Sequence, residues 1–244
     1  MTDPSKAKLE VLADPEALSR RVAEWLVETA TAQRGVFSIA LSGGATPRRL
    51  YEHLAEPPYR DEFPWSRTHW FWGDERFVPH DDDQSNYRMV LEALLSRAPI
   101  PALNIHPVPT DCVSPDAAAA VYARELKSFY GAERLDPVRP LFDVTLLGLG
   151  PDGHTASLFP GTAVLAERDR WVAAVVGAKR EARITLTYPV LESSRHVAFL
   201  VEGKEKRAIF ERLRGGDDSL PAARLRPIGT LCLFADAAAG KPVA

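Results

Sequence analysis

The sequence predicts an α/β fold in which a mostly parallel, doubly wound sheet is covered by helices on both faces. Two observations support this prediction. Short apolar runs, typical of buried strands, alternate with amphipathic segments along the whole chain. Several of the runs end in glycine-rich loops, and such loops bind ligands at the carboxyl edge of an open α/β sheet.

Eight apolar or β-branched segments are expected to be strands. They are residues 36–41, 69–72, 104–106, 144–147, 171–176, 183–187, 195–201 and 231–234. The last is followed by a tail that is expected to fray. We find no internal repeat and no long linker. Residues 1–244 therefore form a single α/β domain in this interpretation, with an ordered core from about residue 10 to 235. A small extra lobe near the proline-rich segment 99–109 is compatible with it.

The expected helices occupy the stretches between these strands. They are residues 15–33, 47–54, 86–97, 114–130 and a segment that opens at 202–206 and ends near 213. In the first, Leu18, Val22 and Leu26 recur at four-residue spacing, as on the buried face of a helix. Thr46 is expected to cap the second helix ahead of a proline. Residues 155–159 are expected to form one helical turn. Together the elements predict a Rossmann-like architecture.

Composition excludes several classes of function. Of 244 residues, 45% are hydrophobic and 26% charged, and the net charge of −3 gives no electrostatic reason to expect nucleic-acid binding. Cys112 and Cys232 lie too far apart to suggest a disulfide framework or a zinc site. The chain starts without an apolar signal core and contains no run long enough to cross a bilayer. We expect a cytoplasmic protein.

The strongest functional signal is the loop after strand 144–147, which contains three glycines and a proline within six residues. This loop carries Asp152 and His154. A single histidine is usually structural, and glycines after a strand often make only a turn. Here loop position, glycine density and an adjacent carboxylate coincide, which favours a catalytic histidine oriented by Asp152.

A second glycine loop follows strand 36–41 and leads into a helix. Ser42, Gly43, Gly44 and Thr46 form this loop, whose backbone amides can bind a phosphate or another oxyanion. A plain strand-to-helix turn is the alternative, although it needs only one glycine. The sequence matches neither a Walker loop nor a GxGxxG fingerprint, so it does not imply nucleotide binding.

Charged residues follow two further strands, and each of them alone is explained by solvent exposure. Asp74 and Arg76 follow strand 69–72, Arg183 begins a neighbouring strand, and Lys206 follows strand 195–201. Because loop tips converge at one sheet edge, we expect these four side chains to join His154 in one site. That set suits proton transfer or hydrolysis on a phosphorylated small molecule, without a nucleophilic cysteine or metal-ligand spacing.

Four motifs resemble the glucosamine-6-phosphate isomerase/6-phosphogluconolactonase family in order and spacing, from about residue 10 to 240. The motifs are Ser42–Pro47, Trp72–Arg76, Gly148–Gly161 and Arg183–Thr187. In the isomerase/deaminase branch an Asn-Glu-Pro sequence continues the histidine loop. Here Ser157-Leu158-Phe159-Pro160 stands in its place, which favours the lactonase branch.

The resemblance implies hydrolysis of 6-phosphoglucono-δ-lactone in the oxidative pentose phosphate pathway, with no metal or organic cofactor. His154 would be the general base, tuned by Asp152, with Arg76 and Asp74 at the lactone end. The amides of Ser42–Gly44, with Arg183 and Lys206, would bind the phosphate. The expected partner is the small-molecule substrate, with no nucleic acid and no membrane, in a monomer or small homo-oligomer.

Two alternatives stay open at this point. The first is the amino-sugar isomerase/deaminase activity of the same family. The second is a non-catalytic regulator that binds a sugar phosphate without acting on it. Against the regulator, every candidate catalytic position holds a chemically competent residue, and the length leaves little room for a DNA-binding or dimerisation segment.

Overall fold

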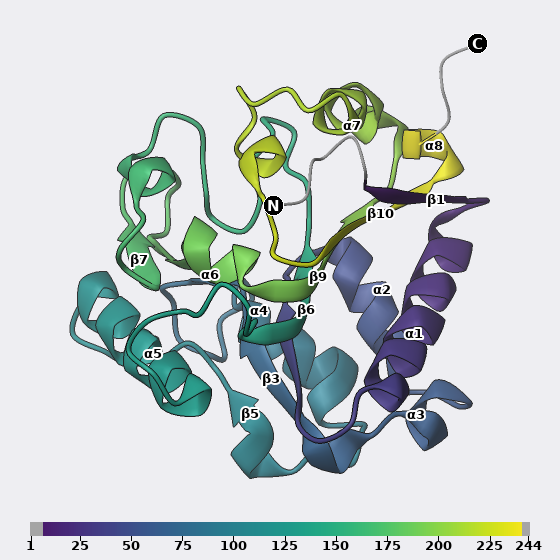
Figure 1. The fold of residues 1–244 in the computed structure, drawn as a ribbon, viewed down its shortest axis with the longest axis horizontal. Coiled ribbons are helices and arrows are strands. Elements are labelled where there is room, and N and C mark those ends of the chain that lie inside the picture. Colours follow the sequence, from purple (N-terminus) through teal and green to yellow (C-terminus); the bar gives the residue numbers. More distant parts are fainter. Residues whose placement is uncertain (1–6, 241–244) are drawn as a thin grey trace.

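Seven parallel strands form the central sheet, in the order β1-β10-β9-β6-β2-β3-β5 (Figure 1). The structure is a computed structural model and describes residues 7–240. The strands are β1 (Lys8–Leu12), β2 (Phe37–Leu41), β3 (Thr68–Trp72), β5 (Ile105–His106), β6 (Phe142–Leu147), β9 (Ser194–Val201) and β10 (Thr230–Asp236). All residues of β2 and β6 are buried, as expected for central strands covered on both faces.

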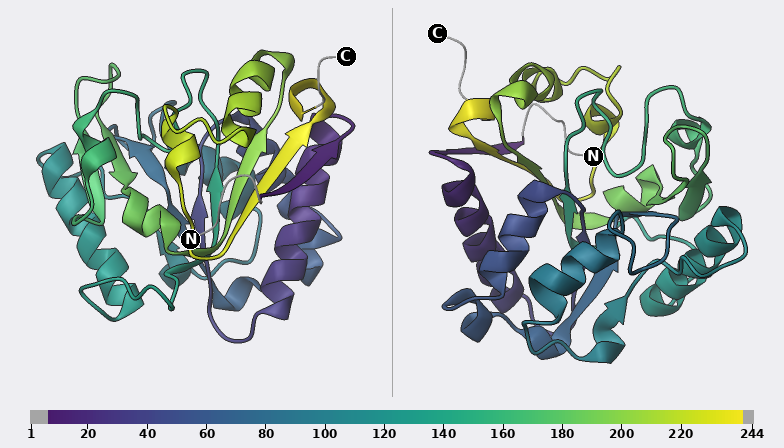
Figure 2. Two further views of the ribbon diagram at one scale, coloured as in Figure 1. Left: turned by 45° about the horizontal axis from the view of Figure 1, so that its top comes forward. Right: turned by 180° about the vertical axis from the view of Figure 1, so that it is seen from behind.

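Helices cover both faces of this sheet (Figure 2). They are α1 (Pro15–Ala32), α2 (Ala45–Leu54), α3 (Tyr59–Glu62), α4 (Asn86–Val90), α5 (Pro115–Tyr130), α6 (Tyr188–Glu192), α7 (Arg207–Arg214) and α8 (Ala237–Gly240). Neighbouring residues of β3 show the two layers. Trp70 stacks on Trp65, which precedes the strand, whereas Phe71 contacts Phe129 of α5. Alternate side chains of a strand point to opposite faces, so both faces carry aromatic packing.

The direction in which the strands are added reverses between β2 and β6. From β2 the chain continues outward to β3 and β5, whereas from β6 it continues the other way to β9 and β10. The chain therefore leaves β2 and β6 toward opposite edges of the sheet, and a crevice opens beyond the carboxyl ends of these two strands. The two glycine loops, after Leu41 and after Leu147, flank this crevice.

A second, three-stranded antiparallel sheet lies beside the first. Its order is β4 (Asp74–Arg76), β8 (Arg183–Leu186) and β7 (Val172–Val175). The predicted strands 171–176 and 183–187 therefore exist, but they belong to this sheet and not to the central one. This sheet packs on α5. The segment 99–109, the expected place of a small extra lobe, holds only a short helical turn and the two-residue strand β5. β4 and β1 were not predicted, because β4 consists of three charged residues and β1 is a short strand with two charged residues and no buried position.

The fold class is confirmed, and two local predictions were wrong. Thr46 does not cap α2, because the helix begins at Ala45 with Gly44 in the capping position. No helical turn forms at 155–159. Instead, Thr155 and Leu158 form an isolated antiparallel bridge that closes a tight loop. The helix predicted at 86–97 is α4, which continues as a π-helical segment to Leu95.

The chain ends need two further remarks. The last strand, predicted to end at residue 234, extends to Asp236 as β10, and α8 follows it. The rest of the expected tail, from 241 onward, lies outside the described residues, as do residues 1–6. Within residues 7–240, no helix has the length and apolar character that a membrane span requires.

Candidate active site

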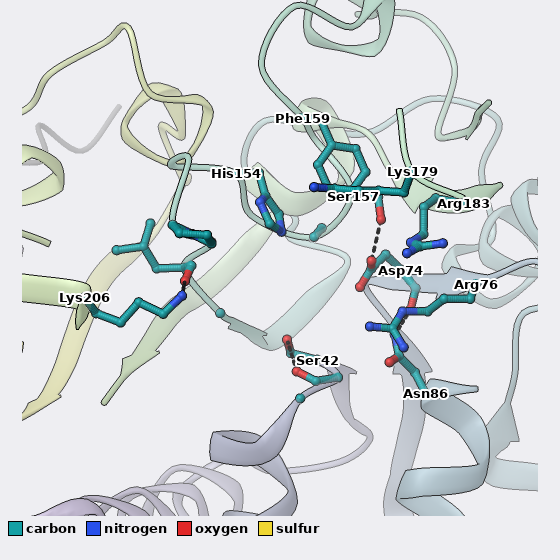
Figure 3. Close-up of a pocket in the computed structure, with 17 residues that line it drawn as sticks. Ser42, Asp74, Arg76, Asn86, His154, Ser157, Phe159, Lys179, Arg183 and Lys206 are labelled. Atoms are coloured by element: carbon teal, nitrogen blue, oxygen red, sulfur yellow. Dashed lines mark hydrogen bonds between the residues drawn. The ribbon is translucent and has the colours of Figure 1, made fainter. Parts of the chain in front are cut away.

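A pocket of about 360 Å³ lies at the carboxyl ends of β2 and β6 (Figure 3). Eight of the predicted site residues line it. They are Ser42, Gly43, Gly44, Asp74, Arg76, His154, Arg183 and Lys206. Of the other two, Asp152 reaches the pocket through its contact with His154, and Thr46 is not part of the lining. Side chains from five separate loops and strands thus meet at one place.

His154 is held by the carboxylate of Asp152. The imidazole Nδ1 lies 2.5 Å from Asp152 Oδ1, which also accepts the His154 backbone N–H at 3.1 Å. Burial opposes ionisation of Asp152, but the hydrogen bonds from His154 outweigh it and lower the pKa of the carboxyl. An ionised carboxylate only accepts. The proton between the two groups therefore lies on Nδ1, so that in the neutral imidazole Nε2 is the nitrogen that can take a proton.

The glycines of this loop make room for the imidazole. A Cβ on Gly150 would lie 2.0 Å from His154 Nδ1, so a larger residue there would displace the ring. Gly153 has a φ of +80°, which L side chains rarely adopt. The Gly150 N–H donates to His154 O at 2.8 Å, and Thr155 Oγ1 donates to Gly148 O at 2.9 Å. The loop is therefore closed on itself and presents His154 in a fixed position.

The first glycine loop is fixed by Tyr51, which is fully buried in α2. Its hydroxyl accepts the Ser42 N–H at 3.0 Å and donates to Ser42 O at 2.8 Å. The Ser42 amide is thus occupied and is not free for an anion, contrary to the expectation for this loop. The structure gives the amides of Gly43 and Gly44 no partner among the described residues. They stand at the amino end of α2, where the helix dipole favours an anion.

Asp74 stands on the side of the pocket away from Lys206 (Figure 3) and is held by two side chains. Ser157 Oγ donates to its carboxylate at 2.5 Å, and Asn86 Nδ2 donates to its backbone oxygen at 2.9 Å. Ser157 is itself buried, and its N–H donates to Thr185 Oγ1 on β8. The histidine loop and the small sheet are connected in this way. Ala156, next to Ser157, has a φ of +46°, a strained value for a residue other than glycine.

Glu75 lies between two pocket residues and is almost fully buried, with 1% exposure. Its two carboxylate oxygens accept the backbone N–H groups of Arg76, Asn86 and Tyr87 and the hydroxyl of Ser85. Burial raises the pKa of this carboxyl against the effect of these hydrogen bonds. Glu75 thus joins β4 to the start of α4 and fixes the wall that carries Arg76 and Asn86.

Arg76 and Arg183 form a concentrated positive charge. They stand opposite each other in the antiparallel pairing of β4 with β8. Burial and the positive charge of Arg76 lower the pKa of Arg183, while Asp74 and Glu181 act in the other direction. Each guanidinium also donates to a backbone carbonyl, Arg76 to Gln84 and Arg183 to Glu181. Two adjacent guanidinium groups of this kind favour an anionic or strongly polarised ligand.

The pocket has two ends, with His154 between them (Figure 3). Lys206 approaches from one side and donates to Leu149 O at 2.8 Å. Arg76, Arg183 and Asp74 stand on the other side, so Arg183 does not accompany Lys206 as the sequence suggested. Within residues 7–240, no group of three or more His, Cys, Asp or Glu side chains could hold a metal ion.

Four lining residues with polar, charged or aromatic side chains were not predicted as site residues: Asn86, Ser157, Phe159 and Lys179. Ser157 and Phe159 belong to the histidine motif but were expected in a helical turn. Asn86 was expected only as the first residue of the helix 86–97. A signal for it exists in Gly43, where a Cβ would lie 1.9 Å from Asn86 Oδ1, but that contact depends on the tertiary structure. Lys179 lies in a loop without any motif.

Comparison with known proteins gives a consistent result. Residues 13–233 match the family model described as glucosamine-6-phosphate isomerases/6-phosphogluconolactonase. A protein of Nostoc sp. named 6-phosphogluconolactonase is 42% identical over 96% of this chain and 98% of its own length. A protein of the same name from Rattus norvegicus is 36% identical over 99% of this chain and 95% of its own length.

Solved structures agree with the sequence relatives. The 6-phosphogluconolactonase of Thermotoga maritima superposes with a TM-score of 0.81 at 35% identity, covering 95% of this chain and all of that one. The enzyme of that name from Trypanosoma brucei gives 0.81 at 30% identity, covering 98% and 99%. A monomeric glucosamine-6-phosphate deaminase gives 0.80 at 19% identity, covering 95% and 98%, and at that identity the likeness is one of fold.

Proposed function

We propose that this chain, which belongs to the glucosamine-6-phosphate isomerase/6-phosphogluconolactonase family, hydrolyses 6-phosphoglucono-δ-lactone to 6-phosphogluconate, the lactone step of the oxidative pentose phosphate pathway. The observation that carries the proposal is the position of His154, paired with Asp152, between an anion-binding loop and a pair of arginines. Relatives named for this activity match most of the chain.

The chemical step begins with His154. Its Nε2 takes a proton from a water molecule as that water attacks the lactone carbonyl, and Asp152 stabilises the resulting imidazolium. The carbonyl oxygen becomes an oxyanion. When the carbonyl re-forms, the bond to the ring oxygen breaks, and the ring oxygen takes the proton back from His154. The free carboxylic acid then loses its own proton to solvent.

Binding is divided between the two ends of the pocket. The phosphate binds the free amides of Gly43 and Gly44 and the ammonium of Lys206, where a helix terminus and a cation act together. The lactone end lies toward Asp74, Arg76 and Arg183. We therefore assign Arg183 to the lactone end, whereas the sequence analysis assigned it to the phosphate. Fixing the phosphate lets remote binding energy position the carbonyl near His154.

The test uses lactone generated in situ, with spontaneous ring opening subtracted. His154→Ala is expected to lower kcat by about 10²-fold or more, the usual scale for loss of a general base. His53→Ala is the matched control, since His53 is a half-buried residue of α2 that contacts Glu16 and does not line the pocket. Parent-like turnover in His154→Ala would reject the mechanism, and no acceleration of lactone hydrolysis by the parent would reject the function.

The two alternatives make different predictions in the same assay. A deaminase would release ammonia from glucosamine 6-phosphate, and a regulator would bind the sugar phosphate without accelerating hydrolysis. A cytoplasmic location and a monomer or small homo-oligomer remain our predictions for this protein. Cell fractionation and sedimentation velocity test them directly.

A further inference from the structure

We propose that Lys179 is a further catalytic residue, whose ammonium binds the oxyanion formed at the lactone carbonyl and then the product carboxylate. This inference rests on the proposed function, because it assigns a role within that reaction. Lys179 lies in the loop between β7 and β8 and lines the pocket. The loop contains no recognisable motif, so only the tertiary structure brings this lysine to the site.

The other cations of the pocket are already engaged with the protein. Arg76, Arg183 and Lys206 each donate to a backbone carbonyl. In contrast, Lys179 makes no hydrogen bond or ion pair with any residue from 7 to 240 that the structure describes. All three of its N–H donors are therefore available to a ligand.

An aromatic contact places Lys179 close to the reacting group. Its Nζ lies 5.0 Å from the centre of the Phe159 ring, a cation–π arrangement that uses none of its protons. The imidazole of His154 contacts the same ring, with 4.7 Å between the ring centres. In Figure 3 the ammonium end of Lys179 extends along Phe159 toward His154. The base and the free cation are thus held on one aromatic side chain.

This arrangement fits the charge that the reaction creates. When water attacks, the electron pair of the carbonyl bond moves to oxygen. The resulting anion lies close to His154, which takes the proton of that water. That anion lasts until the bond to the ring oxygen breaks. Hydrolysis then leaves a carboxylate at the same carbon, where the substrate had a neutral ester. A cation beside His154 therefore stabilises the transition state and product more than the substrate.

The experiment compares Lys179→Met with the parent. Methionine keeps an unbranched side chain that can contact Phe159 and removes the ammonium with its charge and its N–H donors. Arg180→Met is the matched control, because Arg180 is the next residue of the same loop and its side chain is 92% exposed. We measure kcat and KM for the lactone. We also measure inhibition by 6-phosphogluconate and by glucitol 6-phosphate, which carries the phosphate but has no carboxylate.

We expect Lys179→Met to lower kcat by about 10²-fold, as for loss of one oxyanion donor. The inhibition constant of 6-phosphogluconate should rise at least about tenfold, while that of glucitol 6-phosphate stays within twofold. Equal weakening of both inhibitors would overturn the proposal, because it would assign Lys179 to the phosphate or to the shape of the loop. Unchanged kcat with unchanged inhibition would also overturn it, whereas the function itself fails only if the parent does not hydrolyse the lactone.

Discussion

Replacing Glu75 with glutamine tests how the wall of the pocket is held together. In the parent, Oε1 accepts the N–H groups of Arg76 at 2.8 Å and Asn86 at 2.7 Å. Oε2 accepts the N–H of Tyr87 at 2.7 Å and the hydroxyl of Ser85 at 3.2 Å. Both oxygens are thus acceptors for two donors each. Glutamine has the same shape, but one of its two terminal groups is an NH₂ donor.

The least costly orientation of the new amide points its NH₂ group toward Ser85 and Tyr87. The Ser85 hydroxyl can rotate and accept, but the Tyr87 N–H cannot and loses its partner. An unsatisfied buried donor costs about 1–3 kcal/mol. Removing a buried charge offsets part of this cost, because burial disfavours the ionised form of Glu75 and raises its pKa. We therefore expect Glu75→Gln to lower the free energy of unfolding by about 1–2 kcal/mol.

Urea unfolding followed by tryptophan fluorescence measures this loss as a lower midpoint at unchanged slope. Glu211→Gln, an exposed position on α7, serves as the control and should unfold like the parent. We also expect a raised KM, since Arg76 and Asn86 are positioned through Glu75. A Glu75→Gln variant with the midpoint and KM of the parent would refute the reasoning, because the four hydrogen bonds would then contribute nothing.

Two further predictions concern the glycine loop and a histidine pair. Tyr51→Phe leaves the N–H and C=O of Ser42 without their partner, so we expect a stability loss of about 1–3 kcal/mol and a higher KM with a smaller change in kcat. An unchanged KM in steady-state assays would contradict this. Burial, and then repulsion from His106, lower the pKa of His69, so the unfolded state binds more protons below about pH 6.5. Stability should therefore fall from pH 7.5 to 5.5, and less steeply in His69→Gln. Equal slopes in urea titrations of both proteins would count against it.

The sequence by itself determined the central architecture. Strands β2, β6 and β9 each contain a mostly apolar run because both faces of a parallel sheet are buried, and such runs can be recognised without coordinates. The same holds for the two glycine loops, since a turn after a buried strand at the sheet edge needs glycine. His154 and Asp152 were identified together because two residues of separation on one loop already allow their contact.

The tertiary structure decided how the remaining groups share the pocket. The strands 172–175 and 183–186 have the sequence pattern of central strands, yet they pair with each other. The second of them also pairs with the unpredicted β4, more than a hundred residues earlier in the chain. That pairing sets Arg183 beside Arg76 and away from Lys206. Tyr51 occupies the Ser42 amide, and Phe159 brings Lys179 to His154. Local sequence patterns do not reveal these contacts, because each contact depends on how separate segments are placed in the folded chain.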